Sequence, residues 1–105
     1  MPPSIQVNHS AHRAFGRLIR LTLDGDTRLD FTAEEAATVS RALTTVREGR
    51  SAEREIYMSP TASDHEFSCV VLADGVRVTV GRRAAELRWA EVERLAHDLV
   101  ARHLE

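Results

Sequence analysis

Lysine is absent from this chain of 105 residues, and all 14 of its Lys or Arg positions are arginine. Arginine therefore also fills ordinary surface positions that lysine takes in other proteins. A single arginine is informative only where a planar, two-pronged donor is needed. The formal net charge of −2 gives no global attraction to nucleic acid or to an anionic membrane, so any charge-dependent function must come from a local arrangement.

Cysteine and long apolar runs are scarce as well. The single cysteine, Cys69, excludes an intramolecular disulfide. No apolar run is long enough to span a bilayer, and the first residues lack the charged and then apolar pattern of a signal peptide. We therefore expect a soluble protein with no membrane partner, and a reducing, cytoplasmic location as the default.

Signatures of catalysis and of cofactor binding are missing. No glycine-rich loop precedes a predicted helix, and Gly81-Arg82-Arg83 lacks the glycines and the lysine of a phosphate-binding loop. The Ser-Asp-His run at 63–65 is contiguous, whereas a catalytic triad is recognised by its geometry across a fold. We expect no enzyme, no catalytic residue and no cofactor.

Candidate metal ligands occur in pairs. His9 and His12 lie near the N-terminus, and Glu93 and His97 are four residues apart on a predicted helix. Because a closed zinc site needs three or four ligands, these pairs predict no metal site. Cys69 lies in an apolar strand pattern, which is typical of a buried, unreactive thiol.

The N-terminal 12 residues are polar and include two of the three prolines. This composition predicts a flexible tail over residues 1–12, with at most a short extended piece at 5–7. A single α+β domain is then expected over residues 13–105.

Apolar and polar residues alternate over 15–23, as in a half-buried strand. Asp24 and Gly25 are a turn signal, and the alternation resumes at Leu29. We predict a three-residue loop ending at Gly25, because this loop sets Leu21 on the same sheet face as Leu29.

The clearest boundary follows. Thr32 and Glu35 have the spacing of a capping box at the start of a helix, and Gly49 is placed to end it. The apolar stripe of this helix is Ala36, Val39, Leu43 and Val46.

Four further strands and one helix are predicted. Their ranges are 53–59, 67–72, 76–80, a weak strand at 84–88, and a helix over 89–103 with the stripe Val92, Leu95, Ala96 and Leu99. A two-residue turn at Asp74-Gly75 would pair Val71 with Val78 and Cys69 with Val80.

The predicted order is β-β-α-β-β-β-α, before the weak strand is counted. Hairpins between the strands favour an α+β, two-layer sandwich, with a mainly antiparallel sheet and both helices on one face. The other face of the sheet would be open. The two helix stripes also superpose at a constant offset, so a duplicated hairpin-then-helix unit is an alternative origin.

The open face is where we expect function. Its mixture of tyrosine, apolar and polar residues is typical of a non-obligate interface. We predict a non-enzymatic binding or assembly module that forms a homodimer through this face. The predicted interface residues are Tyr57, Val70, Leu72, Thr22 and Thr79.

The alternative is binding of an anion or a single-stranded nucleic acid. Arginines gather on the predicted strands and turns, which would make the sheet side basic. Stacking aromatics are scarce, however, and acidic residues interrupt the basic face. The residues of this second site are Arg20, Arg28, Arg77, Arg82 and Arg83. The third possibility is that the open sheet face binds nothing and is simply solvated.

Overall fold

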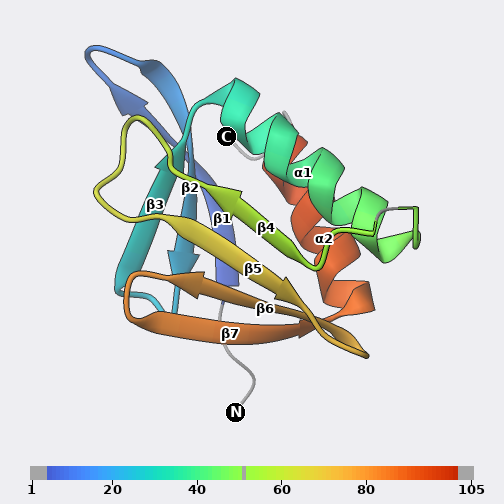
Figure 1. Ribbon diagram of the computed structural model, residues 1–105. Coiled ribbons are helices and arrows are strands. Elements are labelled where there is room, and N and C mark those ends of the chain that lie inside the picture. Colours follow the sequence, from blue (N-terminus) through green and yellow to red (C-terminus); the bar gives the residue numbers. More distant parts are fainter. Residues whose placement is uncertain (1–4, 51, 102–105) are drawn as a thin grey trace.

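The chain folds as two antiparallel meanders, each followed by a helix (Figure 1). A computed structural model describes residues 5–50 and 52–101. The elements are β1 (Ile5–His12), β2 (Gly16–Leu23), β3 (Thr27–Phe31), α1 (Ala33–Arg47), β4 (Glu55–Met58), β5 (Phe67–Val71), β6 (Gly75–Val80), β7 (Arg83–Arg88) and α2 (Trp89–Val100).

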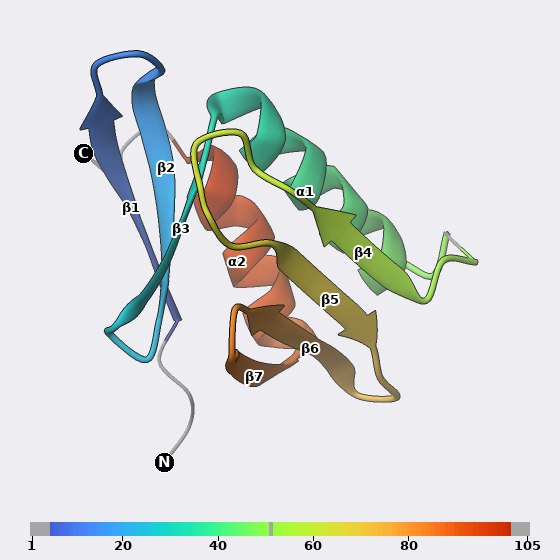
Figure 2. The same cartoon turned by 60° about the vertical axis from the view of Figure 1, so that its left-hand side comes forward.

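The predicted α+β class is confirmed, with antiparallel strands and two helices in the predicted order. The strands form two sheets instead of one, ordered β1-β2-β3 and β4-β5-β6-β7. The two helices lie side by side against one face of each sheet, and the other face of β4–β7 is uncovered (Figure 2). The weak strand predicted at 84–88 is fully formed as β7.

Residues 5–12 correct the predicted flexible tail, because they form β1 and pair with β2 along their whole length. Ile5 and Val7 are half-buried and face the core, whereas Gln6 and Asn8 are exposed. The polar residues that suggested a tail thus alternate on the outer face of an edge strand. The first four residues of the predicted tail lie outside the described part of the chain.

In the β2–β3 hairpin, Leu21 and Leu29 lie on the same sheet face, as predicted. Leu21 pairs with Leu29, and both side chains are buried. Three residues, 24–26, connect the strands, so Gly25 stands in the middle of the loop and not at its end. Gly25 has φ +81° and Asp24 has φ +56°, and such left-handed conformations are tolerated best by glycine and by Asp or Asn.

Helix α1 begins and ends as predicted. The Thr32 hydroxyl accepts from the Glu35 N–H at 3.2 Å, and the Glu35 carboxylate accepts from the Thr32 N–H at 2.8 Å. Gly49 follows the C-cap with φ +71°. The predicted stripes of both helices are buried, and the Ser40 hydroxyl of α1 donates to the Ala96 carbonyl of α2 at 2.6 Å. The predicted last residues of α2, 102–103, lie outside the described residues.

The β5–β6 hairpin differs from the prediction by two residues of register. Val71 pairs with Val76, and Cys69 with Val78. The two-residue turn is therefore Ala73-Asp74, closed by a Leu72 N–H to Gly75 carbonyl bond of 2.8 Å. Gly75 lies in β6, and a Cβ there would approach the Leu87 carbonyl oxygen to 1.8 Å. The glycine permits a close approach of β6 and β7 and is not a turn residue.

A single hydrophobic core joins the two sheets and the helices. Phe31 and Phe67 meet edge to face at its centre, with ring centroids 5.9 Å apart, a favourable aromatic arrangement. Trp89 packs against this core and is partly buried. Phe15 is different: it lies in the β1–β2 turn, 40% exposed, with its ring 4.9 Å from that of His12.

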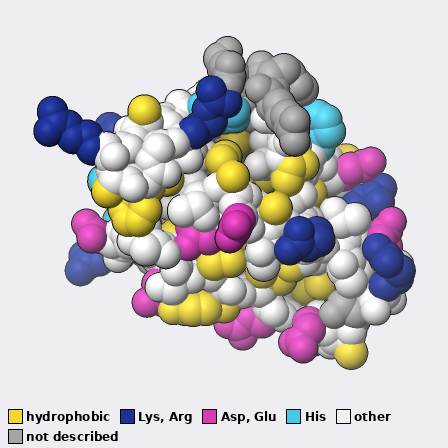
Figure 3. All heavy atoms as spheres, turned by 90° about the horizontal axis from the view of Figure 1, so that it is seen from above, with side chains coloured by type: hydrophobic (Ala, Val, Ile, Leu, Met, Phe, Trp, Pro, Cys, Tyr) yellow, Lys and Arg dark blue, Asp and Glu magenta, His cyan; other side chains and the backbone are white. Residues whose placement is uncertain are grey.

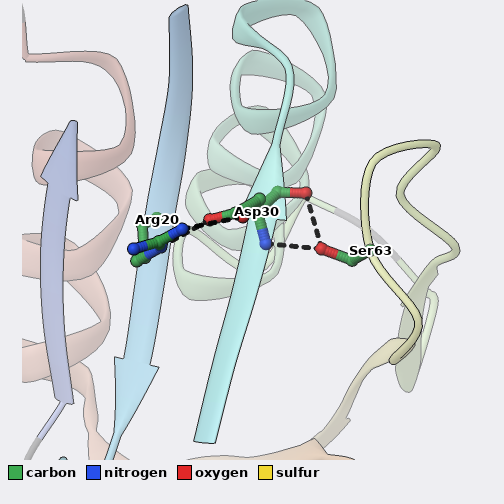
Figure 4. A network of polar contacts seen from close by, with 3 residues as sticks. All are labelled: Arg20, Asp30 and Ser63. Carbon is green, nitrogen blue, oxygen red and sulfur yellow. Dashed lines mark hydrogen bonds and ion pairs between the residues drawn. The ribbon is translucent and has the colours of Figure 1, made fainter. Parts of the chain in front are cut away.

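The β4–β5 loop ties the second sheet to the first (Figure 4). The Ser63 hydroxyl accepts from the Asp30 N–H at 2.6 Å and donates to the Asp30 carbonyl at 3.0 Å. Both backbone groups lie on the edge of β3, so one serine occupies the place of a neighbouring strand there. The Asp30 side chain meanwhile accepts two bonds from Arg20, at 2.8 and 3.2 Å.

Candidate interaction surface on the second sheet

The uncovered face of β4–β7 is a candidate surface, and no helix lies in front of it (Figure 1). The registers set its side chains in two rows across the four strands. We call these eight residues the outer-sheet surface: Tyr57, Ser68, Thr79 and Ala84 in the first row, and Glu55, Val70, Arg77 and Glu86 in the second.

Two large hydrophobic side chains face water on this surface. Tyr57 is 57% exposed and Val70 is 41% exposed. They lie on neighbouring strands, because Tyr57 pairs with Ser68 and Val70 pairs with Glu55. An exposed aromatic beside an exposed aliphatic residue, with polar neighbours, has the composition of a protein–protein contact.

Charge is confined to the second row. Across the strands this row runs Glu55, Val70, Arg77 and Glu86, and Arg77 bonds to Glu86 at 2.8 Å across the β6–β7 ladder. All three charged side chains are exposed. The surface thus has one uncharged row and one row of alternating sign.

Interaction with the Glu66 carboxylate raises the pKa of Tyr57 above its ordinary value. The phenol is therefore neutral at physiological pH.

The structure divides the predicted interface residues. Tyr57, Val70 and Thr79 lie together on the outer-sheet surface. Leu72 follows β5 and is half-buried. Thr22 lies on β2, in the other sheet, so its placement on the same face is wrong. The reason is the division into two sheets, which an alternating pattern within single strands does not reveal.

The five predicted anion-binding arginines are also divided. Arg20 and Arg28 lie on the first sheet and Arg77 on the second. Arg82 lies in the β6–β7 turn, and Arg83 begins β7. Three of them bond to carboxylates: Arg20 to Asp30 at 2.8 Å, Arg77 to Glu86 at 2.8 Å, and Arg83 to Asp26 at 3.1 Å.

These pairings reduce the positive charge that a ligand would meet. The bond to Asp30 raises the pKa of Arg20, so the Arg20 cation stays charged and paired with Asp30. Arg28 and Arg82 are exposed and have no carboxylate within ion-pair distance in the described part of the chain. On the face drawn in Figure 3, basic and acidic side chains are interspersed with hydrophobic ones.

The candidate metal ligands Glu93 and His97 of α2 have structural partners. Glu93 bonds to Arg47 at 2.8 Å, and His97 approaches Asp98 at 3.4 Å. Within 5–50 and 52–101, no three His, Cys, Asp or Glu side chains are grouped to hold a metal ion. Burial raises the pKa of Cys69 to about 12, so its thiol is protonated and buried as predicted.

Two features have no sequence signal of their own. Thr61 bonds to Glu35 and Ser63 bonds to Asp30, but both lie in a segment that the sequence marks only as a polar loop, because their partners lie far away in the chain. Strand β1 reads as a tail. The serine- and threonine-rich composition of the loop was the one available hint, since such side chains often bond to backbone.

Neither described helix is long and apolar enough to cross a membrane. Comparisons with protein-family models, with curated proteins and with solved structures found no match to this chain.

Proposed function

We propose that this chain is a non-enzymatic assembly module that forms a homodimer through the outer-sheet surface. The observation that carries the proposal is the adjacent exposure of Tyr57 and Val70 on an uncovered sheet face. Covering them would remove apolar area from water at about 25 cal/mol per Å². A reducing, cytoplasmic location belongs to the proposal, because the one thiol of the chain, Cys69, is buried and unpaired.

The charges support the pairing of two identical outer-sheet surfaces. A two-fold axis through the outer-sheet surface would bring Arg77 of one copy toward Glu55 of the other, and the reverse. The uncharged row can then form the centre of the contact, with the charged row fixing its register. Complementary charges at a rim improve specificity and association rate more than affinity.

The matched pair Val70→Arg and Val100→Arg tests this contact. Both valines are exposed, 41% and 51%, so neither change buries a charge in the core. Val70 lies on the outer-sheet surface and Val100 at the end of α2. By light scattering at high micromolar concentration, we expect Val70→Arg to halve the particle mass and Val100→Arg to leave it unchanged. A monomeric wild-type protein would end the proposal.

Anion binding is the second candidate, and the observation favouring it is that Arg28 and Arg82 lack a carboxylate partner among the described residues. Titration of labelled single-stranded DNA and RNA at low and moderate salt tests it. Binding that weakens with salt and is lost in the Arg28→Gln/Arg82→Gln double variant would support it. Absence of binding at low ionic strength would exclude it.

A further inference from the structure

Strand β1 has a free edge. It pairs with β2 on one side, and among the described residues no strand or loop pairs with its other side. Figure 2 shows β1 at the outer margin of the molecule. A free edge presents a row of unpaired N–H and C=O groups, which bind another extended strand readily.

The other edges of the two sheets are protected. On β3, the backbone groups of Asp30 are occupied by Ser63. Strand β4 has four residues and begins at the charged Glu55. Strand β7 carries the charges Arg83, Glu86 and Arg88. Short length and charge are the usual devices that keep strand edges from pairing.

Strand β1 carries none of these devices. Its eight residues, IQVNHSAH, include no Asp, Glu, Lys, Arg or Pro. Like charges directly opposite each other destabilise a strand pair, and two copies of this sequence oppose none. A strand of this length is about 26 Å long at roughly 3.3 Å per residue.

Helix α2 does not close the side of this strand. A hollow of about 300 Å³ lies between the first half of β1 and the helix. Ile5 and Val7 line it from the strand, and Leu95, Arg94 and Asp98 line it from the helix. The half-buried Ile5 and Val7 therefore keep exposed apolar area beside the free edge.

We propose that a second copy of the chain pairs with this edge, β1 against β1, antiparallel about a two-fold axis. Opposed residues in an antiparallel pair point to the same face. Ile5, Val7 and His9 of both copies must face the same helix-covered side. Residues with odd numbers must therefore oppose residues with odd numbers. Registers centred on Asn8 and on His9 overlap equally, and only the one centred on Asn8 includes the apolar Ile5.

In that register, Asn8 opposes Asn8 of the partner subunit. Val7 then opposes His9 of the partner subunit, and Ile5 opposes Ala11 of the partner subunit. The two sheets β1-β2-β3 become one continuous six-stranded sheet. This contact is separate from the outer-sheet surface, which lies on the other sheet.

Cysteine cross-linking in a Val70→Arg background tests the register. Asn8 is exposed, so Asn8→Cys is tolerated by the fold. Opposed Cβ atoms lie about 4.5–5.5 Å apart, close to the reach of a disulfide. Arg28→Cys, also exposed and on the same sheet, is the matched control at the protected β3 edge.

Under mild oxidation, we expect Asn8→Cys to form covalent dimers at least about tenfold faster than Arg28→Cys, because pairing raises the effective thiol concentration. Light scattering should show the Val70→Arg protein as a dimer, which is half the mass of a wild-type assembly that uses both contacts. Equal cross-linking rates, or a monomeric Val70→Arg protein, would overturn the β1 pairing and leave the outer-sheet proposal intact. A wild-type dimer that Val70→Arg does not change, with fast Asn8→Cys cross-linking, would do the reverse.

Discussion

Glu35 connects the start of helix α1 to Thr61 in the β4–β5 loop. Its Oε2 accepts from the Thr61 N–H at 3.0 Å and from the Thr61 hydroxyl at 3.1 Å. Its Oε1 accepts from the Thr32 N–H at 2.8 Å within the capping box. One carboxylate therefore serves both as a helix cap and as an anchor for a distant loop.

Replacing Glu35 should destabilise the protein and change its pH dependence. Burial raises the pKa of Glu35, but the bonds from Thr32 and Thr61 outweigh this and leave the pKa below its ordinary 4.5. The charged form thus adds stability above the unfolded pKa, and this is lost as the pH falls through the folded pKa. We expect Glu35→Ala to cost about 1–2 kcal/mol at neutral pH.

Urea unfolding from about pH 3 to pH 7 measures this effect. Glu35→Gln should flatten the loss of stability at the acidic end, because the amide does not titrate. Glu34→Gln is the matched control, an exposed acid in the same helical turn. An unchanged acid profile in Glu35→Gln would contradict the assignment.

Ser63→Ala should expose the edge of β3. The change removes both bonds to the Asp30 backbone, and a lost bond of this kind costs about 1–2 kcal/mol. Hydrogen exchange by NMR should show the Asp30 amide exchanging faster, whereas Ser68→Ala on the outer-sheet surface leaves it unchanged. An Asp30 amide that remains protected would argue against the clamp.

Gly75→Ala and Gly25→Ala compare two reasons for a glycine. The first change places a Cβ 1.8 Å from the Leu87 carbonyl oxygen, so β7 must move, at about 3 kcal/mol or more. The second meets no atom within 4 Å but keeps φ +81°, which costs about 1–2 kcal/mol. Thermal unfolding ranks the two. A smaller loss of stability in Gly75→Ala than in Gly25→Ala would instead support a turn at Asp74-Gly75.

Cys69 should resist thiol reagents in the folded protein. Burial raises its pKa to about 12, and the thiolate is the reactive form. We expect a chromogenic disulfide reagent to modify Cys69 only as fast as the protein unfolds, with full reaction in denaturant. Fast reaction without denaturant would show that the strand opens locally.

The first helix was predictable because its signals are local. Thr32, Glu35 and Gly49 act within a few residues of the helix ends, and the apolar stripe has the helical period. The outward facing of Tyr57 and Val70 was predictable for the same reason, since alternation in a strand needs no knowledge of its neighbours.

The sequence predictions are wrong where the conformation of a residue depends on a distant part of the chain. Gly75 resembles a turn residue, but its small size is required by the backbone of β7. Thr22 was placed with Tyr57 because nothing local separates the two sheets. Strand β1 resembles a tail because its partner β2, and not its own composition, makes it a strand.

The packing of the helices crosses the division between the two sheets. Helix α1 follows the first sheet yet also packs against β4, and helix α2 follows the second sheet yet also packs against β1. The Ser40 to Ala96 bond joins the two helices at their contact. Neither half of the chain therefore encloses a complete core. Separated fragments would have to find each other before either could fold, and we expect the protein to unfold as one cooperative unit although its strands form two sheets.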